Sequence, residues 1–162
     1  MRIDFVCTGG TIDKDYPKHA KSFCFEIASP AVKRILTGIN PNFEYKINSI
    51  MRKDSLEMTA KDRQRIFDAC KKASVKKLIV THGTDTIVKT AEKLSKLKNK
   101  AIVLVGSSLP ERFHGSDAHF NIGVAIGAVT HLKSGVFVAM NGRVYEWDKV
   151  KKISHNGRFV DN

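Results

Sequence analysis

Two turns of the chain place threonine hydroxyls beside glycine, and each turn follows an apolar run. The first is Thr8-Gly9-Gly10-Thr11-Ile12-Asp13, and the second is Thr81-His82-Gly83-Thr84-Asp85-Thr86. A threonine hydroxyl is a poor nucleophile until a base takes its proton. A neighbouring aspartate cannot do this alone, but a desolvated lysine near the pair could act as the base or polarise an intervening water. The turns therefore indicate nucleophilic chemistry.

The structural alternative is that Thr84, Asp85 and Thr86 only cap the helix that follows. One polar residue would be enough for a cap, so the unbroken run of polar residues and glycine after an apolar strand favours function. We interpret His82 as a hydrogen-bonded structural histidine without a catalytic role. Gly106-Ser107-Ser108 is a weak candidate for a phosphate-binding turn, because Pro110 soon breaks any helix.

Cofactor and metal sites are not indicated. The dinucleotide fingerprint needs G-x-G-x-x-G at the start of a helix, and neither that pattern nor a P-loop is present. The six histidines are scattered and lack the spacing of metal ligands. The three cysteines fit neither a disulfide framework nor a zinc site, which favours a reducing cytoplasm.

Strands and helices alternate along the chain. We expect strands at 2–7, 43–47, 78–81, 101–105 and 136–140, and a mobile polar loop at 13–28. The first predicted helix has Ser29 as its N-cap and Pro30 at its first position, and it ends at Gly38. The second is capped by Thr59 with a capping box to Asp62, the third starts at Asp85 or Thr86, and the fourth starts at Ser116 or Asp117. This order predicts a single α/β domain, Rossmann-like or flavodoxin-like, with a mostly parallel sheet covered by helices. Such sheets bind ligands at the carboxyl ends of their strands, where Thr11 and Thr84 would share one crevice.

The chain has 162 residues and a net charge of +12, which suits one globular domain and raises the question of a polyanionic partner. The lysines at 71, 72, 76 and 77 and at 93, 96, 98 and 100 are explained by solvated helix ends. Aromatic residues do not alternate with these lysines, so nucleic acid is disfavoured as the main partner. No apolar run approaches the roughly 20 residues that span a membrane, and the N-terminus has no signal-peptide pattern.

The two threonine turns look like the two signature motifs of the bacterial-type L-asparaginase/glutaminase family. Further similar segments follow in the family's order and extend the resemblance over nearly the whole chain: Asp54-Ser55-Leu56-Glu57-Met58-Thr59, Val105-Gly106-Ser107 through Pro110, Asp117-Ala118-His119-Phe120-Asn121, and Val138-Ala139-Met140-Asn141.

This resemblance implies roles for individual residues. Thr11 resembles the primary nucleophile at the edge of a mobile lid, and Tyr16 is the expected lid tyrosine that activates it. Thr84 and Asp85 resemble the second threonine and its aspartate, which also contacts the α-ammonium of the substrate. Backbone N–H groups near Gly10 and Gly83–Thr84 are the expected oxyanion donors.

The remaining roles are a lysine and the substrate-binding loop. Counting without gaps from Met140-Asn141 places the catalytic lysine at Lys152, with Lys151 and Lys149 as close alternatives. Ser55 would hold the α-carboxylate, and Leu56 replaces a residue that is polar in many members. The residues expected to bind the substrate are Gly10, Ser55, Leu56, Gly83, Thr84 and Asp85.

The implied activity is the hydrolysis of L-asparagine to L-aspartate and ammonia, with L-glutamine as a second candidate substrate. The alternative is an asparaginase-like protein that binds an amino acid or a partner without catalysis. Residues 1–162 resemble the N-terminal catalytic domain alone, without the family's C-terminal domain. In longer members a neighbouring subunit completes the site with an acidic residue. We therefore expect a homodimer or higher homo-oligomer in which a partner supplies a substitute group.

Overall fold

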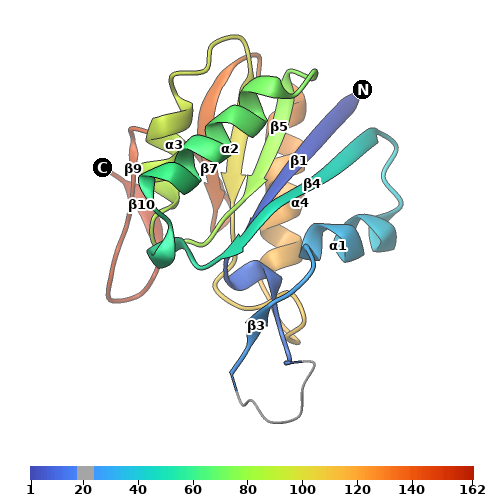
Figure 1. Cartoon of the computed structure of the whole chain (residues 1–162), viewed down its shortest axis with the longest axis vertical. Coiled ribbons are helices and arrows are strands. Elements are labelled where there is room, and N and C mark those ends of the chain that lie inside the picture. The colour runs from blue at the N-terminus through green and yellow to red at the C-terminus, as the bar shows by residue number, and fades with distance from the viewer. Residues whose placement is uncertain (18–23) are drawn as a thin grey trace.

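The fold of the chain was obtained as a computed structural model, which describes residues 1–17 and 24–162 (Figure 1). Its strands are β1 (Arg2–Gly9), β2 (Lys14–Asp15), β3 (Glu26–Ile27), β4 (Glu44–Lys53), β5 (Lys77–Thr81), β6 (Ala101–Val105), β7 (Gly135–Met140), β8 (Arg143–Glu146), β9 (Val150–Lys152) and β10 (Phe159–Asp161). Its helices are α1 (Ala31–Ile39), α2 (Ala60–Lys72), α3 (Ile87–Leu94) and α4 (Ala118–His131), with short 3-10 turns at Thr11–Asp13 and Ser55–Glu57.

The main sheet has six strands in the order β4-β1-β5-β6-β7-β8. All neighbouring pairs from β4 to β7 are parallel, and only β8 is antiparallel. The chain moves to one side of β1 to form β4 and then crosses to the other side to form β5. The order reverses between β1 and β5, and ligands bind at such a reversal in open α/β sheets. The predicted fold class is confirmed, and the reversal falls between the strands that carry the two threonine turns.

Alternating side chains of the strands enter two cores, one on each face of the sheet (Figure 1). Helices α2 and α3 cover one face, where Val6, Val80 and Leu104 pack. Helices α1 and α4 cover the other, where Phe5 and Ile79 pack. Since β1, β5 and β6 are buried on both faces, their apolar runs hold the turns that follow them in fixed positions.

The structure differs from the sequence predictions at several element ends. The loop expected at 13–28 carries β2 and β3, which pair as a short ladder, and Lys18, His19 and Lys21 lie outside the described residues. Helix α1 has Pro30 and not Ser29 at its N-cap, and it does not end at Gly38. It continues to Ile39, and Asn40 takes the left-handed conformation with φ of 44°. The Thr59–Asp62 capping box of α2 is confirmed.

Two lysines interpreted as solvated have structural partners instead. The Lys77 ammonium donates to the carbonyls of Val129 (2.8 Å) and Thr130 (2.6 Å) in the last turn of α4. Lys100 donates to the carbonyls of Ala73 (2.6 Å) and Val75 (2.9 Å) after α2. Lys77 therefore satisfies carbonyls in the last turn of α4, and Lys100 satisfies the C-cap carbonyl of α2 at Ala73 and one carbonyl of the following turn.

We expect Lys77→Met to lower the free energy of unfolding by about 2 kcal/mol, because charge-assisted hydrogen bonds to carbonyls at a helix end are lost. The matched control is Lys76→Met at the neighbouring exposed position, which should change stability by less than about 0.5 kcal/mol. Urea unfolding of the two variants measures the difference. Equal stabilities would contradict a capping role for Lys77.

Candidate active site

Three glycines allow the turns after β1, β5 and β6 to touch. Gly10 has φ of 86°, and a side chain there would overlap the backbone of Gly83. A Cβ atom on Gly83 would lie 2.8 Å from the Ser55 hydroxyl oxygen. A Cβ atom on Gly106 would lie 2.5 Å from the His82 carbonyl and 3.1 Å from the Thr84 methyl carbon. The turn that carries Thr11 therefore lies directly against the turn that carries Thr84.

Lys152 lies beside the second turn. Its ammonium donates to the Thr84 hydroxyl at 2.9 Å and forms an ion pair with Asp85 at 2.5 Å. The Thr84 side chain is half-buried, whereas the Asp85 side chain is 46% exposed. Three polar groups thus meet at the mouth of the crevice, with one carboxylate oxygen already engaged by the lysine.

The hairpin β9–β10 positions Lys152, and sequence reasoning missed what holds it. The Tyr145 hydroxyl donates to the Phe159 carbonyl at 2.8 Å, and the Phe159 N–H donates to the Asn141 side chain at 3.1 Å. Phe159 is also the ladder partner of Lys152. The sequence carries only a weak signal for this hairpin, because its strands are short and charged.

Ser55 reaches the site from the loop after β4. Its side chain is buried, and its hydroxyl has no hydrogen-bond partner among the described residues. The neighbouring Leu56 is not buried with Ser55 but is 72% exposed. Asp54 accepts a hydrogen bond from the Leu56 N–H at 3.2 Å and pairs with Lys14 at 3.2 Å, so this loop is tied to the turn after Thr11.

Arg63 and Thr86 fix the position of Ser55, and the sequence analysis did not identify Arg63. The Thr86 hydroxyl donates to the Ser55 carbonyl at 2.8 Å. Arg63 donates to the Thr86 hydroxyl at 2.9 Å and to the Met58 carbonyl at 2.8 Å. Thr86 therefore links the second signature turn to the Ser55 loop, in addition to preceding α3.

Tyr16 lies between β2 and β3 and is 68% exposed. Its ring contacts Phe25, with centroids 5.4 Å apart, and Phe113, with centroids 6.5 Å apart. Asp15 next to it pairs with Arg112 at 3.0 Å. These contacts hold the Tyr16 ring against the loop after β6, and the Thr11 hydroxyl has no hydrogen bond to another described residue.

The turn after β6 is not a free phosphate-binding turn. The Asp117 carboxylate accepts the N–H groups of Ser108 (2.9 Å) and Leu109 (3.0 Å). Asn121 donates to the Gly106 carbonyl at 3.1 Å and to Asp117 at 2.9 Å. Since these groups pair with one another, they shape the crevice wall beside Thr84.

His82 is a buried structural residue. Its Nδ1 lies 2.7 Å from the Gly83 carbonyl, which can only accept, so Nδ1 carries the hydrogen. Nε2 then accepts from the Thr90 hydroxyl at 2.8 Å. Complete burial lowers the pKa of His82 to about 4, which keeps the ring neutral and agrees with a structural role.

Asp13 is a second buried group close to Thr11, and it caps α1. Its carboxylate accepts the Ala31 N–H at 2.8 Å, a bond that Pro30 at the N-cap position cannot supply from its side chain. Burial raises the pKa of Asp13 to about 7, against the opposing effects of the Ala31 N–H, Arg34 and Arg52. This carboxyl group therefore holds its proton through mildly acidic pH in the folded state.

Asp13 and His82 should have opposite effects on stability between about pH 5 and pH 6. Folding favours the protonated form of Asp13, so the free energy of unfolding falls as pH rises toward 7. Folding favours the neutral form of His82, so the free energy of unfolding falls as pH drops below 6.5. We therefore expect the two to offset one another in the native sequence. Asp13→Asn keeps a hydrogen-bond acceptor for the Ala31 N–H and removes the titrating carboxyl group. Only the His82 effect then remains, so the free energy of unfolding of the variant should rise by about 1 kcal/mol from pH 5 to pH 6. Urea unfolding at both pH values measures this change, and equal slopes in both proteins would contradict it.

Candidate metal ligands and charged side chains are distributed as follows over the described residues. Among residues 1–17 and 24–162, no cluster of three or more His, Cys, Asp or Glu side chains could hold a metal ion. None of the described helices has the length and apolar character needed to cross a bilayer.

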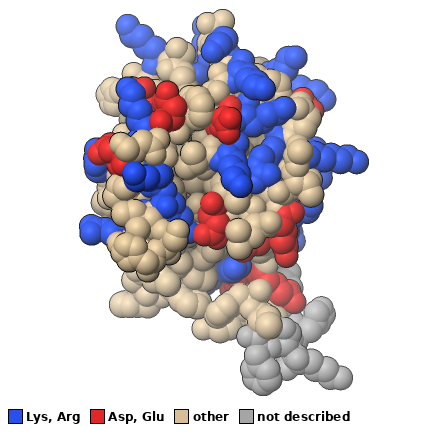
Figure 2. Space-filling view, turned by 90° about the vertical axis from the view of Figure 1, so that its left-hand side faces the viewer, with Lys and Arg blue, Asp and Glu red and all other residues tan. Residues whose placement is uncertain are grey.

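Lysine and arginine side chains dominate the upper part of one face, with acidic side chains among them (Figure 2).

The chain is similar to asparaginases and to a component of an amidotransferase. Residues 2–159 match the family described as Asparaginase, N-terminal. The chain is 30% identical to the glutaminase-asparaginase of Acinetobacter glutaminasificans over 93% of this chain and 49% of that protein. It is also 30% identical to one of the subunits of the glutamyl-tRNA(Gln) amidotransferase of Methanococcus maripaludis, over 96% of this chain and 40% of that protein.

The fold agrees with these sequence matches. The thermostable L-asparaginase from Thermococcus kodakarensis superposes with a TM-score of 0.86 and 26% identity, covering 99% of this chain and 51% of that structure. The chain thus spans about half the length of these relatives or less. The family match over nearly all its residues, the shared fold and the two threonine turns lead to one conclusion: the chain belongs to the family of asparaginase N-terminal domains.

Proposed function

We propose that this domain carries the catalytic groups of an amidohydrolase that converts L-asparagine to L-aspartate and ammonia, with Thr11 as the nucleophile. The observation that carries the proposal is the contact of Lys152 with Thr84 and Asp85, beside the turn that presents Thr11. Amide hydrolysis through an acyl-enzyme needs a nucleophile, a proton relay and donors for an oxyanion, and this crevice supplies candidates for all three.

In the proposed reaction the Thr11 oxygen attacks the side-chain amide carbon. The carbon–nitrogen bond breaks, and the amide nitrogen leaves as ammonia with the proton lost from Thr11. Water then attacks the ester, which releases aspartate and returns a proton to Thr11. Thr84 and Lys152 form the proton relay, and Tyr16 assists Thr11 from the lid.

Asp85 links substrate binding to this relay. In the described arrangement its carboxylate pairs with Lys152 at 2.5 Å. A substrate α-ammonium that binds Asp85 would compete for this carboxylate and leave the Lys152 amine free to exchange a proton with Thr84. The unpaired Ser55 hydroxyl suits the α-carboxylate, because a buried donor without a partner gains from an anionic acceptor.

Backbone N–H groups remain available for the oxyanion. The Gly10 N–H already donates to the Lys53 carbonyl at 2.9 Å, which removes it from the expected donors. The N–H groups of Gly83 and Thr84 have no hydrogen bond to another described residue. We therefore assign the oxyanion site to Gly83 and Thr84.

Release of ammonia from L-asparagine and from L-glutamine by the purified protein tests the proposal. Faster release from L-asparagine supports it. Release from neither substrate at millimolar concentration would favour the non-catalytic alternative, in which asparagine or aspartate raises the melting temperature without turnover. Light scattering on the same sample tests the proposed homo-oligomer.

A further inference from the structure

Strand β4 forms one edge of the main sheet, and among the described strands it pairs with β1 alone. The Glu44 N–H donates to the Met1 carbonyl at 3.0 Å, which sets the direction of the ladder. Residues alternate in a parallel ladder, so Lys46 and Asn48 also turn their backbone groups toward β1. Tyr45, Ile47 and Ser49 turn their N–H and C=O groups outward, where no other described residue bonds them.

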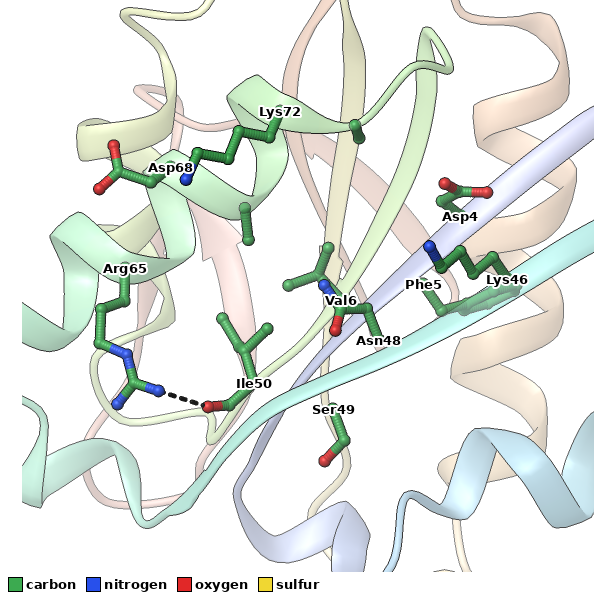
Figure 3. Close-up of a pocket in the computed structure, with 12 residues that line it drawn as sticks. Asp4, Phe5, Val6, Lys46, Asn48, Ser49, Ile50, Arg65, Asp68 and Lys72 are labelled. Carbon is green, nitrogen blue, oxygen red and sulfur yellow. Dashed lines mark hydrogen bonds between the residues drawn. The ribbon is translucent and has the colours of Figure 1, made fainter.

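The edge is hollow on both faces of the sheet. On the α2 face, a groove of about 640 Å³ lies between β4 and α2, lined by Lys46, Asn48 and Ile50 on one side and Arg65 and Lys72 on the other (Figure 3). Ser49 also lines this groove, and its side chain lies on the other side of β4 from those of Asn48 and Ile50 (Figure 3).

A second groove lies on the opposite face. It has a volume of about 390 Å³ between α1 and β4 and includes Pro30, Tyr45 and Ile47. Side chains of an added strand point alternately to the two faces of a sheet. The two grooves would therefore receive the two sets of side chains of a strand placed beside β4.

Charge identifies the kind of strand that fits. Lys46, Arg65 and Lys72 line the larger groove, and Lys33 lines the smaller one. Of the acidic lining residues, Asp4 pairs with Arg2 at 2.9 Å and 3.2 Å, whereas Asp68 accepts only from the neutral Gln64 amide at 2.9 Å and keeps its negative charge. The three cations of the larger groove therefore outnumber its one carboxylate without a cationic partner among the described residues.

A second copy is a poor occupant of this edge. Each copy carries a net charge of +12, and pairing β4 with its counterpart would bring the same cations together. A segment with carboxylate side chains has the opposite charge and meets no such repulsion.

We propose that β4 is a docking edge for an extended acidic segment of another protein, which adds to the sheet beside Tyr45, Ile47 and Ser49. Main-chain hydrogen bonds to the outward groups would provide affinity, and carboxylates would pair with the groove lysines and Arg65. This surface lies apart from Thr11 and Thr84, so the inference does not depend on the proposed activity.

Hydrogen exchange followed by NMR on the native protein tests the proposal directly. The probe is a capped peptide of about eight residues that alternates Glu and Val. Saturating peptide should slow the exchange of the Tyr45, Ile47 and Ser49 amides by at least about tenfold. The Lys46 and Asn48 amides, already bonded to β1, should change little. No selective protection at millimolar peptide overturns the proposal.

One substitution in the protein and one in the peptide test the main-chain hydrogen bonds and the charge pairing separately. Ser49→Pro removes one outward N–H without touching the ladder to β1 and should weaken peptide binding about fivefold or more, whereas Ser49→Ala should bind normally. A peptide with Lys in place of Glu should bind at least about tenfold more weakly. If Ser49→Pro fails to fold, N-methylation of the peptide at alternate residues removes the same bonds from the other side.

Other occupants would produce different results. Protection of the outward amides that grows with protein concentration in the absence of peptide would identify a second copy and overturn the proposal. Equal binding of the Glu and Lys peptides would overturn the charge argument. Binding of a single-stranded oligonucleotide at these grooves in preference to the acidic peptide would identify nucleic acid as the occupant instead.

Discussion

Thr11→Ala should reduce ammonia release from L-asparagine by about 10⁴-fold or more, because the other hydroxyl of this turn, on Thr8, is buried and donates to the Thr81 carbonyl at 2.8 Å. The loss should fall on kcat, since the covalent step itself disappears. Ammonia release measured over hours at a high enzyme concentration is sensitive enough to detect a loss of this size. The fold should survive, because the Thr11 side chain has no hydrogen bond to another described residue.

Thr11→Ser is the matched control for this variant. It keeps the hydroxyl and removes only a methyl group, so it should retain measurable turnover while Thr11→Ala does not. Melting curves of both variants should match that of the native protein to within a few degrees. Native-like turnover by Thr11→Ala would show that Thr11 is not the nucleophile, even if the protein proves to be an asparaginase.

Lys152→Met should lower kcat by about 10² to 10⁴, the range expected when a proton relay is removed. Methionine keeps an unbranched side chain of similar length but cannot donate to Thr84 or pair with Asp85. The loss of the lysine leaves the Asp85 carboxylate without its 2.5 Å partner. Because Asp85 is 46% exposed, water can solvate it, and the cost in stability should be small.

Lys151→Met and Lys149→Met are the matched controls, because both lysines are close in sequence and exposed. Lys149 pairs with Glu146 at 2.9 Å on the surface. Both controls should keep native turnover. A larger loss in either control than in Lys152→Met would move the relay to that lysine.

Much of the fold could be predicted from local pattern. The buried strands at 78–81 and 101–105 are short apolar runs, and the start of α2 follows from the Thr59–Asp62 capping box. Element ends were less predictable, as the continuation of α1 past Gly38 shows. The C-terminal end of α1 is set by Asn40, which takes the left-handed conformation and donates to the Leu36 carbonyl. The start of α1 depends on a cap from another part of the chain, because Asp13 accepts the Ala31 N–H.

The sequence by itself determined the alternation of the four helices with the five parallel strands of the main sheet, and the two threonine turns, since those depend on residues close in the chain. The short strands β2, β3, β8, β9 and β10 were not predicted. Only the tertiary structure decided which groups meet. Lys152 reaches Thr84 across 68 residues because the β9–β10 hairpin packs on Tyr145 and Asn141. Lys77 binds the end of α4 across 52 residues. Such contacts depend on how whole elements pack against one another. A local pattern of residue types does not specify which side chains from distant parts of the chain come into contact.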